Sequence, residues 1–98
     1  MTDRSNDSVP LTAQDVEARL VSLPRWKLAA GAITATWEFH DFVAAMQFVN
    51  QVAALAERAQ HHPDIDIRWN KVTLSLSTHD AGGITAKDFE LARQIDLA

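Results

Sequence analysis

The alternation between helical and strand patterns constrains the fold of this chain more than any other feature. Three segments carry helix signals, and they run from Ala13 to Ser22, from Phe42 to about Ala59, and from Ala86 towards Leu97. Each gap between them holds two short segments in which apolar and polar residues alternate, as they do in half-buried strands. The order helix, hairpin, helix, hairpin, helix predicts an α+β fold, with a four-stranded antiparallel sheet and three helices on one face.

The first predicted hairpin joins Trp26–Ala29 to Ile33–Phe39 through a turn at Ala30-Gly31. The second predicted hairpin turns at Asn70-Lys71, two residues that fit a short connection between strands. The alternation gives each of the three longer strands one apolar face, and the residues on these faces are Ile33, Ala35, Trp37 and Phe39, then Ile65, Ile67 and Trp69, then Val72, Leu74 and Leu76.

Capping residues mark where the helices begin. Thr12 with Asp15, and Thr85 with Asp88, have the spacing of a capping box, and Asp41 can cap the long middle helix. Apolar residues three and four positions apart predict the buried stripe of that helix: Phe42, Met46, Val49, Val52, Ala53 and Ala56. A helix normally ends at or before the residue that precedes proline. Pro63 therefore ends the middle helix, and His61 and His62 are expected in the break that follows this helix.

Length and composition indicate one small domain over residues 11–98 after a flexible tail over residues 1–10. The chain has 98 residues, of which 47% are hydrophobic, so there is room for a single core. A domain of this size buries a modest share of its surface, which makes homo-oligomerisation a natural source of stability. The loop Asp80–Gly83, before the last helix, is expected to be flexible.

Charge and residue usage exclude several classes of protein. The formal net charge is −4 and the basic residues are scattered, which argues against nucleic-acid binding. No apolar run is long enough to span a bilayer, and no signal peptide is visible. The absence of cysteine excludes disulfides and suits a cytoplasmic protein.

Three of the four histidines are the main candidates for function. His61 and His62 precede the second hairpin and His79 follows it, so the open end of the hairpin is expected to bring them together. Histidine exchanges protons near neutral pH, which suits acid/base catalysis. Glu57, Ser77, Thr78 and Asp80 lie nearby in the sequence and add carboxylate and hydroxyl groups.

A metal site is the rival interpretation, because three histidines can bind zinc and leave a fourth position open. Adjacent histidines on a strand point to opposite faces, and the chain lacks a His-x-His or His-Glu-x-x-His pattern, so no metal and no cofactor are expected. The fourth histidine, His40, falls on the polar face of its strand and is expected to be a surface residue.

These residues resemble the pterin-4a-carbinolamine dehydratase family. The resemblance rests on the spacing of Glu57, His61-His62-Pro63, Trp69, His79 and Asp88, and it extends from about Trp26 to Asp96. It implies dehydration of 4a-hydroxytetrahydropterin to quinonoid dihydropterin, which recycles the pterin cofactor of aromatic amino acid hydroxylases. It also implies the same α+β fold, assembled as a homodimer or homotetramer.

The resemblance implies roles for particular residues. His61 and His79 would be the acid/base pair, and His62 would bind the substrate or assist. The substrate would contact Glu57, Gln60, His61, His62, Ser77, Thr78, His79 and Asp80. Gln60 stands where Asp or Asn is often found, and Asp88 is expected only to cap the last helix. Some relatives act instead as dimerisation partners of a transcription factor or as assembly factors, which leaves a non-catalytic interaction protein as the alternative.

Overall fold

The computed structural model of the protein describes residues 9–98, so most of the predicted tail over residues 1–10 lies outside the described residues. Three helices are present: α2 (Ala13–Leu20), α3 (Phe42–Ala59) and α4 (Ala86–Leu97). Four strands are present: β1 (Lys27–Ala29), β2 (Ala32–Glu38), β3 (Asp64–Arg68) and β4 (Lys71–Leu76). A short 3-10 helix, η1 (His79–Ala81), precedes α4.

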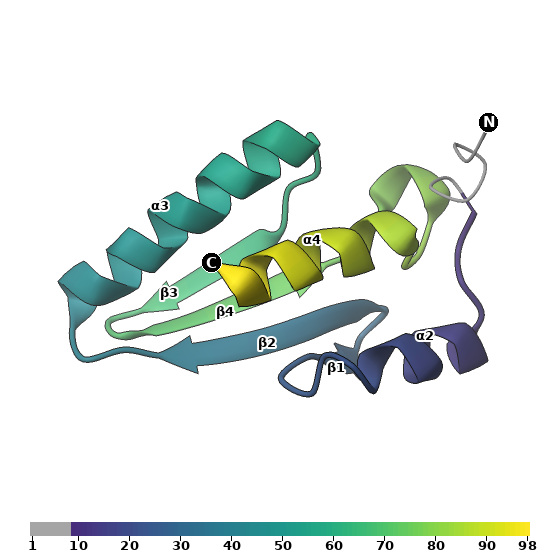
Figure 1. The fold of residues 1–98 in the computed structure, drawn as a ribbon, viewed down its shortest axis with the longest axis horizontal. Coiled ribbons are helices and arrows are strands. Elements are labelled where there is room, and N and C mark those ends of the chain that lie inside the picture. The colour runs from purple at the N-terminus through teal and green to yellow at the C-terminus, as the bar shows by residue number, and fades with distance from the viewer. Residues whose placement is uncertain (1–8) are drawn as a thin grey trace.

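The strands form one antiparallel sheet in the order β1-β2-β4-β3. All three helices lie on one face of this sheet, with α4 between α3 and α2 (Figure 1). The predicted α+β fold is therefore confirmed, including the order of its elements. β2 and β4 occupy the centre of the sheet, so the second strand of one hairpin pairs with the second strand of the other.

The core lies between the central strands and the helices. Its fully buried apolar side chains come from β2, α3, β4 and α4, and the largest are Ile33, Val52, Val72, Leu74, Leu76, Leu91 and Ile95. The aromatic rings of Trp37 and Phe48 lie 4.8 Å apart and join β2 to α3 at the end of this core. Because Leu91 and Ile95 are buried in this core, α4 is fixed over the sheet. Its first turn is thereby held close to the end of β4.

The first hairpin turns where the sequence predicted. Ala29 pairs with Ala32, which leaves Ala30 and Gly31 as the turn, and both have positive φ. This left-handed conformation matches the twist of a two-residue hairpin. This conformation is strained for Ala30, which has a Cβ atom, whereas Gly31 adopts it without strain.

The predicted turn of the second hairpin is wrong by one residue. Arg68 pairs with Lys71, so the turn is Trp69-Asn70 rather than Asn70-Lys71. The buried Asn70 decides this position, because its side-chain Nδ2 donates to the Phe39 carbonyl at 2.8 Å and its own carbonyl accepts from the Phe39 N–H. A contact between the two hairpins thus sets the position of the turn in the second hairpin. The local sequence pattern does not indicate this contact.

The predicted buried stripe of α3 is partly wrong. Val52 and Ala56 are buried as expected, but Phe42 and Ala53 are exposed. The side chains that face the core are Ala45, Phe48, Val52 and Ala56. Both stripes have helical spacing, and the position of the neighbouring α4 selects between them.

The segment from Asp80 to Gly83, expected to be flexible, forms an ordered turn. Residues His79–Ala81 adopt the 3-10 helix η1, and Gly82 ends it in the left-handed conformation with φ 76°. Thr78 and Gly83 close the turn by pairing through their backbones, with Thr78 N–H donating to the Gly83 carbonyl at 2.8 Å. The turn therefore fixes Thr78 at the base of α4.

β3 is an edge strand with all five residues exposed. Ile65 and Ile67 remain 38% and 36% exposed, and the adjoining Trp69 is 67% exposed. The apolar face predicted for this strand exists, and the helices that the structure describes leave it partly exposed. Among the described residues, no helix is long and apolar enough to cross a membrane.

Candidate functional site

The end of α3 aims the histidine pair away from the helix axis. Gln60 adopts the left-handed conformation (φ 53°, ψ 43°), and its N–H and that of His61 bond back to carbonyls of the last helical turn. This arrangement is a Schellman motif, in which glycine usually occupies the left-handed position. Gln60 thus fixes the direction in which the chain leaves α3 and carries His61 towards α4.

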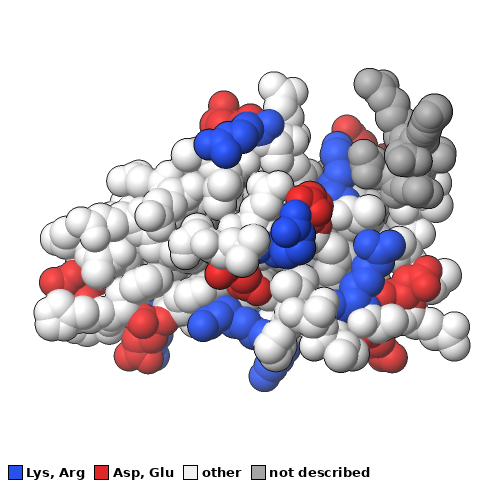
Figure 2. Space-filling model, in the orientation of Figure 1, with Lys and Arg blue, Asp and Glu red and all other residues white. Residues whose placement is uncertain are grey.

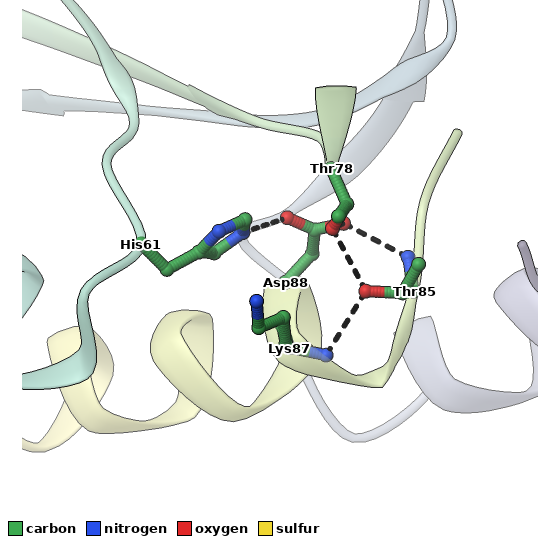
Figure 3. Close-up of polar contacts among 5 residues, drawn as sticks. All are labelled: His61, Thr78, Thr85, Lys87 and Asp88. Carbon is green, nitrogen blue, oxygen red and sulfur yellow. Dashed lines mark hydrogen bonds and ion pairs between the residues drawn. The ribbon is translucent and has the colours of Figure 1, made fainter. Parts of the chain in front are cut away.

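His61 makes a direct contact with α4. Its Nε2 lies 2.5 Å from Oδ1 of Asp88, which is 27 positions further along the chain. The Asp88 side chain is 0% exposed and the His61 side chain 11% exposed, so water screens this pair very little. The pair joins the loop after α3 to the first turn of α4 (Figure 3).

The buried carboxylate of Asp88 is fully hydrogen-bonded. Its Oδ2 accepts from the Thr85 N–H at 2.9 Å and from the Thr78 hydroxyl at 2.9 Å, while Oδ1 faces His61. The bond to Thr85 is one half of the predicted capping box, which the structure confirms. Asp88 therefore caps α4 with one oxygen and contacts a histidine with the other.

This network assigns the proton on His61. An ionised carboxylate can only accept hydrogen bonds, so Nε2 of His61 donates to Asp88 Oδ1. In the neutral ring, Nδ1 is then left without a proton and can accept one. Among the described residues, no group hydrogen-bonds to Nδ1, so this atom is the one available for proton transfer.

The second histidine forms a local and more exposed pair. Nε2 of His62 lies 2.6 Å from Oε2 of Glu57 on the last turns of α3, and the two side chains are 62% and 78% exposed. The structure thus places two of the expected site residues against each other. The pair can present an imidazole to solvent, where a ligand can reach it.

The remaining residues of the expected site lie along the end of β4 and η1. Thr78 is buried and bonded to Asp88, Ser77 is half-buried, and His79 and Asp80 are exposed on η1. Asp88 thus connects the loop of His61 with the chain beside His79. No hydrogen bond or ion pair within residues 9–98 joins His79 to His61 or His62, so the convergence of all three histidines stays a prediction.

The surface histidine is located as expected. His40 has a side chain that is 91% exposed and lies 3.8 Å from the Asp41 carboxylate. Within the described part of the chain, no three His, Asp or Glu side chains are grouped so that they could hold one metal ion.

A cavity of about 690 Å³ opens beside His61, between α2, the end of α3 and α4. This volume lies within the range typical of pockets for small molecules. His61 is the only residue of the expected site among those that line it, which are Arg19, Ser22, Leu23, Ala59, His61, Ala86, Lys87, Phe89, Glu90, Leu91, Arg93 and Gln94.

Basic residues predominate among the charged groups around this cavity, although the chain as a whole is acidic. Arg19, Lys87 and Arg93 line it together with a single carboxylate, that of Glu90. On the helical face as a whole, Lys and Arg side chains lie among Asp and Glu side chains (Figure 2). Hydrogen bonds from Arg93 and then Gln94 lower the pKa of the Glu90 carboxyl from its usual value of 4.5.

Sequence reasoning missed the contact between His61 and Asp88, and it selected Thr85 only as a helix cap. The sequence did hold one indication that Asp88 has a further partner, because a capping box uses only one oxygen of the carboxylate. When the helix start is buried, the second oxygen needs a donor as well. The donor came from a residue far away in the sequence, so only the packing of α3 against α4 identifies it.

Comparisons with known proteins agree with this fold. Residues 9–98 match the model of the family described as pterin 4 alpha carbinolamine dehydratase. A protein of Acidobacterium capsulatum, provisionally named a pterin-4-alpha-carbinolamine dehydratase, is 62% identical over 86 residues, which cover 88% of this chain and 94% of the relative. A protein of Roseiflexus castenholzii with the same provisional name is 57% identical and covers 88% and 92% of the two chains.

Solved structures give the same result. The crystal structure of a transcriptional coactivator/pterin dehydratase from Brucella melitensis has a TM-score of 0.85 and 33% identity, with 90% of this chain and 96% of that chain covered. A pterin dehydratase-like protein, identified as a RuBisCO assembly factor in the alpha-carboxysome, shares the fold alone, with a TM-score of 0.60, 20% identity and coverage of 74% and 84%. The match over residues 9–98 and the identity to the first relative show that this chain belongs to the pterin 4 alpha carbinolamine dehydratase family.

Proposed function

We propose that this protein is a 4a-hydroxytetrahydropterin dehydratase. It removes water from C4a and N5 of the carbinolamine and yields quinonoid dihydropterin, the form from which the cofactor of aromatic amino acid hydroxylases is regenerated. The expected compartment is the cytoplasm. The observation that carries the proposal is the contact of His61 with the buried Asp88, next in the chain to the exposed pair of His62 and Glu57.

The reaction needs one acid and one base. The C4a hydroxyl leaves as water only when it gains a proton, and N5 must lose its proton as the double bond forms. In this proposal, Nδ1 of His61 transfers one of these protons, since Nε2 is held by Asp88. His79 transfers the other, and His62, with Glu57, binds the pterin or assists.

The contact with Asp88 suits His61 to this role. A carboxylate that accepts from one ring nitrogen fixes the tautomer and orientation of the ring, and it stabilises the imidazolium that forms when the other nitrogen gains a proton. The Asp88 carboxylate is buried and is itself held by two further donors, so little rearrangement is needed during proton transfer.

The direct test is the decay of a 4a-hydroxytetrahydropterin that a hydroxylase generates in the assay. Absorbance follows the appearance of quinonoid dihydropterin with the purified protein and with an equal amount of an unrelated protein. Acceleration that persists in the presence of a metal chelator supports the proposal. If a folded preparation does not accelerate the decay, the protein is not a dehydratase, and the alternative of a non-catalytic interaction or assembly factor gains support.

We also propose that the chain forms a homodimer or homotetramer, with β3 in an interface between copies. β3 lies at the edge of the sheet, and Ile65, Ile67 and the adjoining Trp69 are exposed on it. An exposed edge with apolar side chains is a template for pairing with another strand. A second copy of the same edge supplies a symmetric partner for it.

A further inference from the structure

Two threonine hydroxyls lie behind the carboxylate that holds His61. The hydroxyl of Thr85 lies 2.8 Å from that of Thr78, and the hydroxyl of Thr78 lies 2.9 Å from Asp88 Oδ2. The Lys87 N–H donates to the Thr85 hydroxyl oxygen at 3.2 Å. Thr78, Thr85 and Asp88 are all buried, so water does not compete for these bonds (Figure 3).

The direction of every bond in this chain follows from the number of hydrogens. A threonine hydroxyl has one hydrogen, and an ionised carboxylate has none. Thr78 therefore donates its hydrogen to Asp88, and its oxygen accepts the hydrogen of Thr85. The oxygen of Thr85 in turn accepts from the backbone of Lys87. All the bonds point the same way, towards the oxygen of Asp88 that does not face His61.

We propose that Thr78 and Thr85 are positioning residues that act on His61 through Asp88. Their bonds hold Oδ2 of a carboxylate that is buried, and they thereby keep Oδ1 turned towards His61. With Asp88 ionised, Nε2 of His61 must be the donor, and Nδ1 stays available for proton transfer.

The same geometry separates Thr78 from the substrate. Its hydroxyl hydrogen is used by Asp88 and its side chain is buried, so it has no hydrogen to donate to a pterin. The family resemblance placed Thr78 among the substrate contacts. In this proposal Thr78 does not contact the substrate and acts on it through Asp88 and His61. Loss of its hydroxyl is therefore expected to lower kcat and to leave KM unchanged.

This inference rests on the proposed function for its kinetic part only. The tautomer of His61 can be read without substrate, from the nitrogen chemical shifts of the imidazole in 15N-labelled protein. The wild-type ring is expected to carry its proton on Nε2. In Thr78→Val, which removes the hydroxyl and keeps the shape, Asp88 loses one of the donors that hold its Oδ2. Oδ1 is then no longer fixed against Nε2, and a fraction of the rings is expected to carry the proton on Nδ1.

Kinetics supply the second measurement. Thr78→Val should lower kcat by about tenfold, as loss of a supporting hydrogen bond does, with KM within about twofold of wild type. Thr78→Ser restores the hydroxyl and should restore both the tautomer and kcat. Thr36→Val is the matched control, since it removes one partner of a hydroxyl pair, Thr36 with Thr73 at 2.9 Å, that makes no hydrogen bond to Asp88.

Each outcome bears on the proposal. An unchanged His61 tautomer in folded Thr78→Val overturns it, and a raised KM with unchanged kcat shows instead that Thr78 contacts the substrate. If Thr78→Val does not fold, Thr85→Val tests the same chain of bonds one step earlier, because its backbone N–H to Asp88 remains. A wild-type protein without dehydratase activity overturns the proposed function, while the tautomer still decides the positioning role.

Discussion

Nε2 of His61 lies 2.5 Å from Oδ1 of Asp88, a residue 27 positions away that also caps the start of α4. One carboxylate thus stabilises a helix and orients a histidine. The start of α4 cannot move without moving Asp88, so the packing of this helix on the sheet determines where the imidazole lies. The geometry of the His61–Asp88 pair is in this way a direct consequence of the fold.

Asp88→Asn is expected to reverse the tautomer of His61. Oδ2 accepts from Thr78 and Thr85 in the wild type, so the amide oxygen of Asn takes that place and its NH₂ faces Nε2. Nε2 must then accept, and the proton moves to Nδ1. A wrong tautomer lowers kcat by about 10² to 10⁴-fold.

Steady-state kinetics and imidazole nitrogen shifts check this expectation together. Asp15→Asn serves as the control, because Asp15 occupies the corresponding capped position of α2 and lies on an exposed turn. A variant Asp88→Asn with wild-type kcat would show that the pair with His61 is only structural.

Gln60→Gly is expected to stabilise the protein by about 0.5 to 1 kcal/mol. The left-handed conformation costs a residue with a side chain about 1 to 2 kcal/mol, and the greater freedom of glycine in the unfolded chain offsets part of the gain. Chemical denaturation measures the difference. Ala59→Gly, one residue earlier and within α3, is the control and should destabilise by about 0.5 to 1 kcal/mol. Equal destabilisation by both variants would contradict this account of Gln60.

Ile67→Glu is expected to shift the protein from an oligomer to a monomer. The charge would lie on the apolar face of the exposed edge strand β3, where the proposed second copy binds. Sedimentation velocity at matched concentrations measures the shift in mass. Leu28→Glu places the same charge on the opposite edge strand, β1, and should leave the assembly unchanged. If wild type and Ile67→Glu have the same mass, β3 is not in the interface.

The carboxyl of Glu90 is expected to titrate below its usual value, because the hydrogen bonds from Arg93 and Gln94 favour its charged form. A lowered folded-state pKa contributes stability above the unfolded-state value, and this contribution is lost as the pH falls through the folded-state value. The effect on stability is well below 1 kcal/mol, since the pair is exposed to solvent. Carboxyl carbon shifts in an NMR titration measure the pKa, and Arg93→Met should raise it. An unchanged titration midpoint in Arg93→Met would contradict the assignment.

Local signals predicted most of the fold. The caps at Thr12, Asp41 and Thr85 all form, and α4 has the predicted bounds, because a cap depends on residues within one turn of each other. The turn at Ala30-Gly31 is likewise a local choice. The second turn was predicted one residue late, because the bond from Asn70 to Phe39 comes from another hairpin.

The site was predictable in its residue types and less so in its contacts. The spacing of His61, His62 and His79 predicted that they lie at one end of the second hairpin, since a hairpin brings its two ends together. The partner of His61 comes from α4, and the proposed roles of Thr78 and Thr85 rest on their burial and their hydrogen bonds. These depend on how helices pack across the sheet, which no spacing along the chain specifies.

The most direct test of the central claim is the dehydration rate of His61→Gln beside that of His40→Gln. Both variants remove one imidazole, but His61 contacts Asp88 next to the cavity, whereas His40 is on the surface. Loss of a general acid or base is expected to lower kcat by about 10² to 10⁴-fold in His61→Gln, with His40→Gln at the wild-type rate. Equal rates for the two folded variants would contradict the assignment of His61 as a catalytic residue.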